Sequence, residues 1–504
     1  MNPALLAALP VAFPIFSGMA LLLFPIRSQR LRHGYAASVT FINALLLLAA
    51  VLWAGEGTFT LWRVTESLTL SFRLDALGKI FTVLVSVIWP PVTFYAFEYL
   101  KHRPPEERFF SFFLTVLGIL IGIACAANFL TLYLFYELLT FATLPLVMHS
   151  LRREAIRAAA KYLVYSITGA CLALSGFFFF YWYGVSTDFT PGGVLDAARI
   201  AGKENLMLTA ALLTLAGFGA KAGMTPLHAW LPTAHPVAPT PASAVLSGLI
   251  TKAGVVAIAR TIYFLAGPRF LRGTWVQTTL IVLSLLTILL GSMLGYMEKH
   301  LKKRIAYSSV SQVSYSVLGL MLLTPDGVTG ALLQLVAHAF AKSCLFLSAG
   351  VIIYFRLPNS NYHYVDQLRG VGKDLPVVMI GFTLASLSLV GLPPTGGFVG
   401  KWFLAVGALN PGLGRLGLSG VIVLLVSAVL TAGYLLPIVT SAFFPGKNDF
   451  PEKNDDEGTI EPMLSRPPTN MQLPLILLST AALLTGVFAG PLVRYFGRFA
   501  ATIL

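Results

Sequence analysis

Long apolar runs separated by short polar stretches make up nearly the whole chain, and this pattern predicts membrane-spanning helices. A helix that crosses a bilayer needs about 20 mostly apolar residues, and fourteen runs approach or exceed that length. The run at 376–408 is too long for one unbroken helix, so we expect a break within it. The predicted spans are 3–26, 34–54, 76–99, 109–127, 129–150, 158–183, 205–225, 241–265, 275–296, 304–323, 327–353, 376–408, 416–443 and 472–490.

Composition agrees with an all-α polytopic membrane protein of about fourteen transmembrane helices. Hydrophobic residues make up 56% of the 504 positions, and charged residues make up 11%. A soluble domain carries roughly 25% charged residues, so soluble enzymes, nucleic-acid-binding proteins and disordered proteins are excluded. The N-terminal run lacks a basic region, so we expect a retained helix rather than a cleaved signal.

The net charge of +14 is explained by topology and does not indicate a nucleic-acid partner. Nineteen basic residues follow odd-numbered spans, whereas nine lie on the opposite side, which includes both termini. Because Lys and Arg gather in cytoplasmic loops, we expect both termini outside the cell membrane. The hydrophilic linker at 447–466 is then cytoplasmic.

Nothing in the sequence predicts a cofactor or a metal centre. Cys125, Cys171 and Cys344 each lie in an apolar run and form no CxxC pair, which argues against iron–sulfur ligation and disulfides. His228, His235 and His338 lack Cys, Asp or Glu neighbours with ligand spacing. We therefore expect any redox chemistry to belong to other chains.

Five ionisable residues lie well inside the apolar runs: Glu137, Lys221, Lys252, Lys342 and Lys401. Each would cost roughly 2.5–3.5 kcal/mol at the bilayer centre, so they should face the interior of the bundle. One acid cannot neutralise four lysines, which makes purely structural ion pairing a poor explanation. Since burial disfavours the protonated form of lysine, a row of groups that gain and lose protons is the stronger interpretation.

The other basic residues in or near the spans fall into two groups: three have a simpler explanation, and one is a further candidate proton carrier. Lys79, Lys161 and Arg260 lie near span ends, and we expect their side chains to reach the membrane interface. His338 lies four residues before Lys342, hence on the same helical face. Histidine titrates near neutral pH, so His338 is a further candidate proton carrier.

Two spans contain sequence breaks beside a candidate lysine. Five prolines lie between Pro226 and Pro241, directly after Lys221, and Pro393, Pro394 and three glycines precede Lys401. Proline removes a backbone donor and glycine weakens a helix, so both spans should unwind. Interrupted helices in corresponding positions of two halves point to inverted repeats with a transport site between them.

Several segments resemble the antiporter-like membrane subunits shared by respiratory complex I, Mrp-type Na⁺/H⁺ antiporters and energy-converting membrane-bound hydrogenases. The resemblance covers roughly residues 70–445 and is strongest in KAGMTPLHAWLPTAHPVAPTPASAVLSGLITKAGVVAIAR at 221–260. Further segments follow in the family's order: HLKKRIAYSSVSQVSYSVLGL, HAFAKSCLFLSAG and GLPPTGGFVGKWFL. The resemblance implies fourteen helices, with helices 4–8 and 9–13 as inverted repeats and helices 7 and 12 broken. It divides the chain into an N-terminal segment (1–108), two repeats (109–265 and 266–445), and a linker with a final helix (446–504).

The resemblance also implies roles for residues of the first repeat. Glu137 matches the fifth-helix glutamate that pairs with the seventh-helix lysine, here Lys221. Lys252 matches the relay residue of the eighth helix, and His235 matches the histidine between helices seven and eight.

In the second repeat, His338 and Lys342 match the eleventh-helix positions that link the two halves, and Lys401 matches the outlet lysine of the twelfth helix. Gln312 stands where many relatives have histidine, which argues against a titratable step on the tenth helix. Lys401 replaces the glutamate of one complex I subtype, and GFVGKWFLAVGAL is most similar to Mrp D-type and hydrogenase-associated subunits.

The predicted function is proton or Na⁺/H⁺ translocation within a multi-subunit complex in the inner (plasma) membrane. The expected partners are other antiporter-like and small helical subunits, the lipid bilayer and H⁺, with Na⁺ as the second candidate ion. A stand-alone secondary transporter of a small solute and a purely structural subunit are the alternatives. The sequence does not identify the parent complex, the direction of transport or its stoichiometry.

Overall fold

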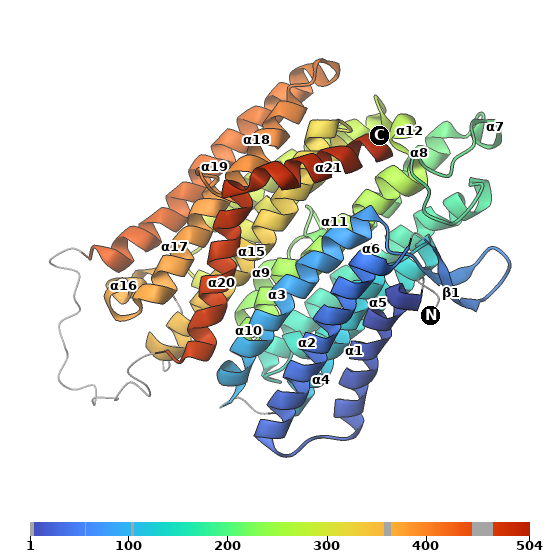
Figure 1. Cartoon of the computed structure of the whole chain (residues 1–504). Helices are drawn as coiled ribbons and strands as arrows, with labels where there is room; N and C mark the ends of the chain where they lie inside the picture. Colours follow the sequence, from blue (N-terminus) through green and yellow to red (C-terminus); the bar gives the residue numbers. More distant parts are fainter. Residues whose placement is uncertain (1–4, 56, 102–104, 357–363, 446–466) are drawn as a thin grey trace, which may run out of the picture.

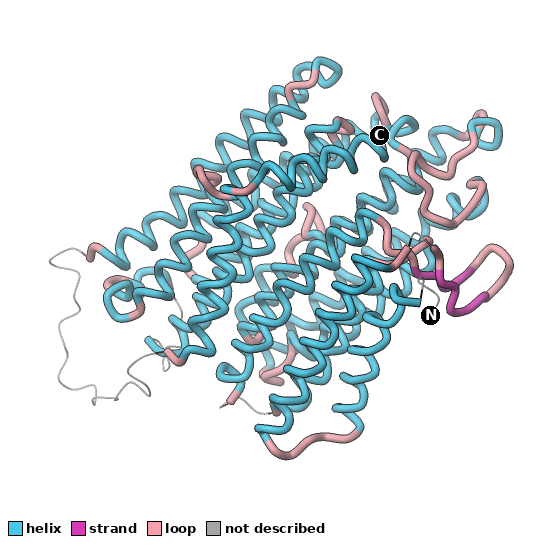
Figure 2. Tube along the Cα trace, in the orientation of Figure 1, coloured by secondary structure: helices cyan, strands magenta, loops and turns pink. Residues whose placement is uncertain are grey.

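The computed structural model describes residues 5–55, 57–101, 105–356, 364–445 and 467–504. Long helices packed side by side dominate these ranges (Figures 1 and 2). Within them, twelve helices are long and apolar enough to cross a membrane. The prediction of an all-α polytopic membrane protein is confirmed, while the count of fourteen crossings and the inverted repeats stay predictions.

Each apolar run predicted in the first half contains a helix, and side-chain caps begin two of these helices. Asp75 and Asn128 accept hydrogen bonds from the backbone N–H groups three residues later, which satisfies donors left free at a helix start. The long helices of this half are α1 (Leu5–Leu23), α2 (Gln29–Trp53), α3 (Ala76–Leu100), α4 (Glu106–Ala124), α5 (Phe129–Val147), α6 (Arg153–Tyr183), α8 (Glu204–Ala222) and α11 (Thr251–Arg260).

The second half likewise places a helix in each predicted run. Two of these runs fall outside the twelve apolar helices, because α14 is rich in serine and the run at 376–408 is divided into two short helices. The helices are α13 (Trp275–Met297), α14 (Leu301–Met321), α15 (Pro325–Arg356), α17 (Pro376–Val390), α18 (Gly396–Ala408), α19 (Gly414–Phe443) and α20 (Thr469–Val487).

Several smaller elements go beyond the sequence prediction. Strands β1 (Phe59–Arg63) and β2 (Thr69–Phe72) form an antiparallel hairpin in which Phe59 lies opposite Phe72. Helix α21 (Ala489–Ile503) follows α20, turns away from its direction (Figure 1) and packs against α15. The remaining short helices are α7 (Ala197–Ile200), α9 (Leu231–Val237), α10 (Thr240–Val245), η1 (Leu246–Ile250), η2 (Thr261–Ala266), α12 (Pro268–Leu271), η3 (Val365–Leu368), α16 (Val371–Asp374) and η4 (Pro411–Leu413).

Both predicted helix breaks are confirmed. Helix α8 ends at Gly223, whose φ is +82°, and the chain resumes as α9 at Leu231. Helix α17 ends at Gly391, whose φ is +88°, and the chain resumes as α18 at Gly396. Glycine adopts this left-handed conformation without the steric cost that a side chain would add.

Connections that the charge bias assigns to the same side of the membrane contact one another. On the predicted cytoplasmic side, Arg32 forms an ion pair with Glu106 at 2.6 Å. On the opposite side, Arg73 donates to the backbone oxygen of Phe189 at 2.5 Å. A connection after an odd-numbered span thus contacts another of the same kind, and the same holds for even-numbered spans. Helices that cross the membrane in alternating directions require this grouping. Which end faces the cytoplasm stays a prediction. The predicted 447–466 linker lies outside the described residues.

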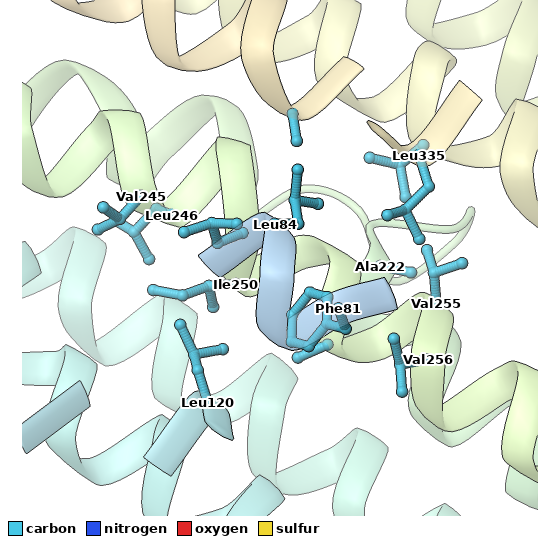
Figure 3. Close-up of a cluster of buried hydrophobic side chains, with 14 of the residues drawn as sticks. Phe81, Leu84, Leu120, Ala222, Val245, Leu246, Ile250, Val255, Val256 and Leu335 are labelled. Atoms are coloured by element: carbon cyan, nitrogen blue, oxygen red, sulfur yellow. The ribbon is translucent and has the colours of Figure 1, made fainter. Parts of the chain in front are cut away.

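Helix α15 joins the two halves of the bundle. It packs against α3, α10 and η1 of the first half and against α14, α17 and α18 of the second. Figure 3 shows a buried cluster of apolar side chains in which Phe81 of α3, Leu246 of η1 and Val255 of α11 lie with Leu335 of α15. In lipid, close packing of this kind helps to hold helices together. Residues carried by α15 are therefore placed between the halves.

Helices α6 and α8 approach closely through glycines. A methyl group added at Gly169 of α6 would lie 2.6 Å from the backbone oxygen of Gly217 on α8. Small residues allow helix backbones to approach in this way within membranes. The contact fixes α8, and with it Lys221 at its end, against α6.

Arg260 contradicts the expectation that it reaches the membrane interface. Its side chain is fully buried and forms an ion pair with Asp75, including a bond from Nη2 to Oδ1 of 2.8 Å. Burial raises the pKa of Asp75, but the charge and hydrogen bonds of Arg260 outweigh this effect and hold the pKa below its usual value. The sequence prediction fails here because Asp75 is 185 residues away and is brought beside Arg260 only by folding. Lys79 and Lys161 are half-buried near helix starts, and their reach to an interface is untested.

Candidate ion-translocation site

All seven residues predicted to carry ions lie on helices of the described structure. Most are buried, whereas Glu137 and Lys401 are half-buried. Their roles stay predictions, but their surroundings can be described one by one. They are Glu137 on α5, Lys221 on α8, His235 on α9, Lys252 on α11, His338 and Lys342 on α15, and Lys401 on α18.

Lys221 lies in the last turn of α8, beside the first helix break, and faces α5. Its ammonium group donates to the Thr140 hydroxyl at 2.8 Å. The ammonium nitrogen also lies 4.4 Å from the centre of the Tyr136 ring and 5.9 Å from the centre of the Tyr162 ring. Aromatic faces attract cations, so Lys221 has neutral partners that accommodate a positive charge.

Glu137 does not form the predicted direct ion pair with Lys221. The ion pairs between described side chains do not include Glu137, which interacts electrostatically with Tyr133 and, at longer range, with Lys221. The physical reason is helical geometry: Glu137 is one residue, or about 100°, around α5 from Tyr136, which faces Lys221. Tyr136 and Thr140 lie four residues apart on that inner face and take the position expected for the carboxylate.

Lys252 lies directly after the π-helical turn η1. Its ammonium group donates to the backbone oxygen of Ser247 at 2.5 Å, and the Thr251 hydroxyl donates to the same oxygen at 2.9 Å. A single π-helical turn inside an α-helix is frequent at functional sites. In this case it contains the carbonyl group that holds a buried lysine. The Ser247 hydroxyl is 2.7 Å from that of Ser309 on α14.

Lys342 and His338 lie on the same face of α15, as predicted, and α14 supplies the partners of the lysine. The Lys342 ammonium group donates to the Ile305 backbone oxygen at 2.7 Å and to the Ser308 hydroxyl. Neither ring nitrogen of His338 has a protein hydrogen-bond partner within the described ranges. The structure thus places two proton-binding groups one turn apart between the halves.

His235 lies on the short helix α9 after the first break and also contacts α15. Its ring stacks on Phe346 of α15, with the ring centres 4.5 Å apart. As at His338, its ring nitrogens lack a protein partner among the residues that the structure describes. The stack brings the short helix α9 against α15, so His235 lies where the first helix break meets the helix that joins the two halves of the bundle.

Lys401 folds back onto the second break. Its ammonium group donates to the backbone oxygens of Leu389 and Val390, at 2.6 and 2.8 Å, at the end of α17. These carbonyls lie at the negative end of the helix dipole, which favours a cation. Gly391 leaves room for the lysine stem, because a side chain there would meet Lys401 Cδ at 2.8 Å.

The sequence predicts no titratable step at Gln312 on the tenth span, and the structure pairs this residue with a second neutral amide. Gln334 on α15 donates to the side-chain oxygen of Gln312 at 2.8 Å, and Gln312 donates to the Leu389 backbone oxygen at 3.2 Å. Lys401 donates to this same carbonyl. The amides therefore connect α15 with the Lys401 break without a titratable group.

The sequence prediction missed the partners that hold the lysines. Thr140, Ser247 and Ser308 each supply an oxygen to a buried ammonium group. A serine-rich tenth span was a visible signal for Ser308, since hydroxyl groups are costly in an apolar helix unless they are bonded. Thr140 and Ser247 carried no comparable signal.

No group of three or more His, Cys, Asp or Glu side chains that could hold a metal ion occurs within the described ranges. The buried groups are instead lysines, histidines and neutral hydroxyls. Lysine is a proton carrier and a poor metal ligand when protonated, since its ammonium group has only donors. The chemistry that this arrangement offers is proton binding and release.

Comparison with known proteins identifies the family of the chain. Residues 126–431 match the family described as NADH:quinone oxidoreductase/Mrp antiporter, TM. The chain belongs to this family. It is 31% identical to NADH-quinone oxidoreductase subunit N of Desulforudis audaxviator (strain MP104C), over 96% of both chains. It is 28% identical to the chloroplast NAD(P)H-quinone oxidoreductase subunit 5 of Vicia faba, and the match spans 54% of that protein's length.

Solved structures share the fold of this family member. A chain of the membrane-bound sulfane sulfur reductase, an archaeal respiratory membrane complex, matches with a TM-score of 0.82 and 22% identity over 99% of both chains. A chain of the Mrp complex from Dietzia sp. DQ12-45-1b matches with a TM-score of 0.81 and 23% identity, over 99% of this chain and 97% of that one. The protein is thus an antiporter-like subunit, and its relatives occur in multi-subunit membrane complexes.

Proposed function

We propose that this antiporter-like subunit moves protons through the membrane by passing them along its buried lysines and histidines. One observation carries the proposal. Among the ion pairs of the described residues, none includes Lys221, Lys252, Lys342 or Lys401, and all four ammonium groups instead meet neutral oxygens. A buried charge without a counter-charge is costly, which suits groups that alternately hold and release a proton.

The path that we infer starts at Lys221 and ends at Lys401. A proton held by Lys221 passes to Lys252, then to His338 and Lys342 on the linking helix α15, and finally to Lys401. His235 lies beside this route through its contact with Phe346. At each step one N–H bond breaks and another forms, with bound water bridging the distances between groups. The ion is H⁺ in this scheme, and Na⁺ is the alternative cation for exchange.

Glu137 is the residue through which a neighbouring subunit acts. It is half-buried on α5, and the surface around it exposes Leu134, Leu138 and Phe141 at 41%, 40% and 54%. A carboxylate facing lipid in such a patch is costly, so a partner subunit or a paired cation should cover it. We expect another antiporter-like or small helical subunit there, within a complex of the plasma membrane.

A stand-alone solute transporter would need polar groups arranged around a cavity. The pocket between α3, α11, α14 and α15 is instead lined by apolar side chains, among them Leu77, Val255 and Leu335. The side chains that line this pocket offer no hydrogen bond to a polar solute.

The test of the proposed function compares the assembled complex with the isolated chain. Inverted membrane vesicles that contain the complex should build a proton gradient when its driving reaction starts. Vesicles from cells lacking only this subunit should lose at least part of that gradient. The purified chain in liposomes should catalyse no solute exchange, and efficient exchange by the chain alone would support the stand-alone transporter instead.

Membrane orientation is a separate prediction. Single cysteines introduced at 447–466 should react with an impermeant thiol reagent only in inverted vesicles, because the basic residues that follow odd-numbered helices favour the cytoplasm. Cysteines in the β1–β2 hairpin should react from the outside of intact cells. Labelling of 447–466 from the cell exterior would reverse the assigned orientation.

A further inference from the structure

Helix α14 carries hydroxyl groups that the proposed path does not use. Ser308, Ser311 and Tyr315 are all buried, and their hydroxyls face α15, α13 and α19. We propose that these groups, together with Ser427 and Tyr434 of α19, form a proton path between Lys342 and Lys401. This inference rests on the proposed function and identifies how its last step is carried.

The path begins at Lys342, which donates to the Ser308 hydroxyl. Ser308 interacts electrostatically with the Tyr434 hydroxyl of α19, and bound water between the two oxygens would complete this step. Tyr434 in turn donates to the Thr431 hydroxyl at 3.3 Å. The contacts lead from the linking helix to α19 through oxygen atoms that can each accept and donate a proton.

The middle of the path is a cluster of three serines from three helices. The Thr431 hydroxyl donates at 2.7 Å to the backbone oxygen of Ser427, one turn earlier on α19, so bound water has to connect Thr431 with the Ser427 hydroxyl. The Ser427 hydroxyl is 2.5 Å from that of Ser292 on α13 and 3.2 Å from that of Ser311 on α14. Ser292 and Ser311 are 2.8 Å apart. Hydroxyls so arranged can exchange donor and acceptor roles by rotation about their C–O bonds.

Tyr315 connects this cluster with Lys401. Its hydroxyl donates to Ser427 at 2.7 Å, and the Lys401 ammonium nitrogen lies 5.2 Å from the centre of its ring. Bound water between the Tyr315 hydroxyl and the Lys401 amine would complete the path at the second helix break. The middle of the path uses hydroxyls of α13, α14 and α19 and does not use the side chains of Gln312 and Gln334, which link α15 to the same break.

The chemistry is a relay without oxidation or reduction. A proton leaving Lys342 bonds to a lone pair of the Ser308 oxygen, while the proton already on that oxygen moves to the next one. Each hydroxyl, and each bound water between hydroxyls that are not in contact, gains one O–H bond and loses another, until the neutral amine of Lys401 gains an N–H bond. The path thus delivers one positive charge, and rotation of the hydroxyls restores their starting directions.

The experiment removes single hydroxyls from the assembled complex. Tyr315→Phe retains the ring beside Lys401, and Ser427→Ala removes the oxygen shared by Ser292, Ser311 and Tyr315. Each variant should lower proton uptake per assembled complex by at least about tenfold. It should also lower the number of protons moved per turnover of the driving reaction, a ratio that a merely structural defect leaves unchanged.

Matched controls lose a buried hydroxyl outside the path. Tyr263→Phe removes a hydroxyl that donates to the Leu320 backbone oxygen, and Ser284→Ala removes one that donates to the Leu280 oxygen of its own helix. Both controls should transport within about twofold of the unmodified complex, since neither hydroxyl joins two carriers.

Three outcomes decide between the proposals. Blocked transport in Lys401→Ala together with loss in Tyr315→Phe and Ser427→Ala supports the hydroxyl path. Blocked transport in Lys401→Ala with normal transport in both hydroxyl variants overturns the hydroxyl path and leaves the proposed function standing. Normal transport in Lys401→Ala overturns the proposed function itself, and the hydroxyl path with it.

Discussion

Replacing Lys401 with alanine is expected to stop proton transport by the assembled complex while leaving the complex intact. Lys401 is the last carrier of the inferred path, and its ammonium group is held by the carbonyls of Leu389 and Val390 at the second helix break. Without an amine there, protons arriving from Lys342 have no final acceptor. Loss of a positioned acid–base group costs about 10²–10⁴-fold in rate. Proton uptake into inverted vesicles measures the effect.

Lys401→Arg separates charge from proton exchange. Arginine retains the positive charge and can still donate to the two carbonyls, but it does not deprotonate in proteins. Transport should therefore stay low although the variant assembles. Lys161→Ala is the control, because this half-buried lysine on α6 lies outside the path and its loss should change transport by less than about twofold. Normal transport in both Lys401→Ala and Lys221→Ala would indicate a structural subunit.

Residue patterns along the chain predict the helices and both breaks. Apolar runs near the length of a bilayer leave few alternatives to helix, because every backbone polar group must be bonded within lipid. The breaks at Gly223 and Gly391 follow from clustered proline and glycine, whose effect on the backbone is local. Features with local causes are the ones that a single sequence reveals.

Contacts between distant residues are the features that the sequence does not reveal. Arg260 pairs with Asp75, which lies 185 positions away in the sequence. Lys221 donates to Thr140, which lies 81 positions away. Such partners depend on how helices rotate against one another, and a rotation of one residue moves a side chain by about 100°. This rotation places Tyr136 and Thr140, rather than Glu137, against Lys221. The buried lysines themselves were predictable because ionisable groups in apolar runs are rare and expensive.

The two broken helices hold their lysines in different ways. Lys221 precedes its break and rests against a hydroxyl and aromatic rings, whereas Lys401 follows its break and binds free carbonyls of the preceding half-helix. A carbonyl pair at a helix end favours the cation directly, while the surroundings of Lys221 leave it open to influence from Glu137. We therefore infer that control of the path begins at Lys221 and that Lys401 serves as the acceptor.

Glu137→Gln is expected to abolish coupled ion transport without preventing assembly. The carboxylate interacts with Lys221 at longer range in this structure, and the lysine donates to Thr140 instead. An opposite charge within about 4–6 Å favours a protonated lysine, so a movement of Glu137 toward or away from Lys221 would load or release the proton. Glutamine has nearly the same shape but no charge, and it removes this control.

The matched variants isolate the charge of Glu137. Glu137→Asp retains the charge on a shorter side chain and should transport at an intermediate rate. Glu98→Gln changes another half-buried carboxylate, which pairs with Lys101 at 3.8 Å near the end of α3 and should leave transport almost unchanged. The proton gradient in inverted vesicles, measured per assembled complex, provides the comparison. Equal gradients in Glu137→Gln and the unmodified complex would show that the carboxylate only supports the structure. Regulation that acts through the charge of Glu137 is lost when that charge is removed.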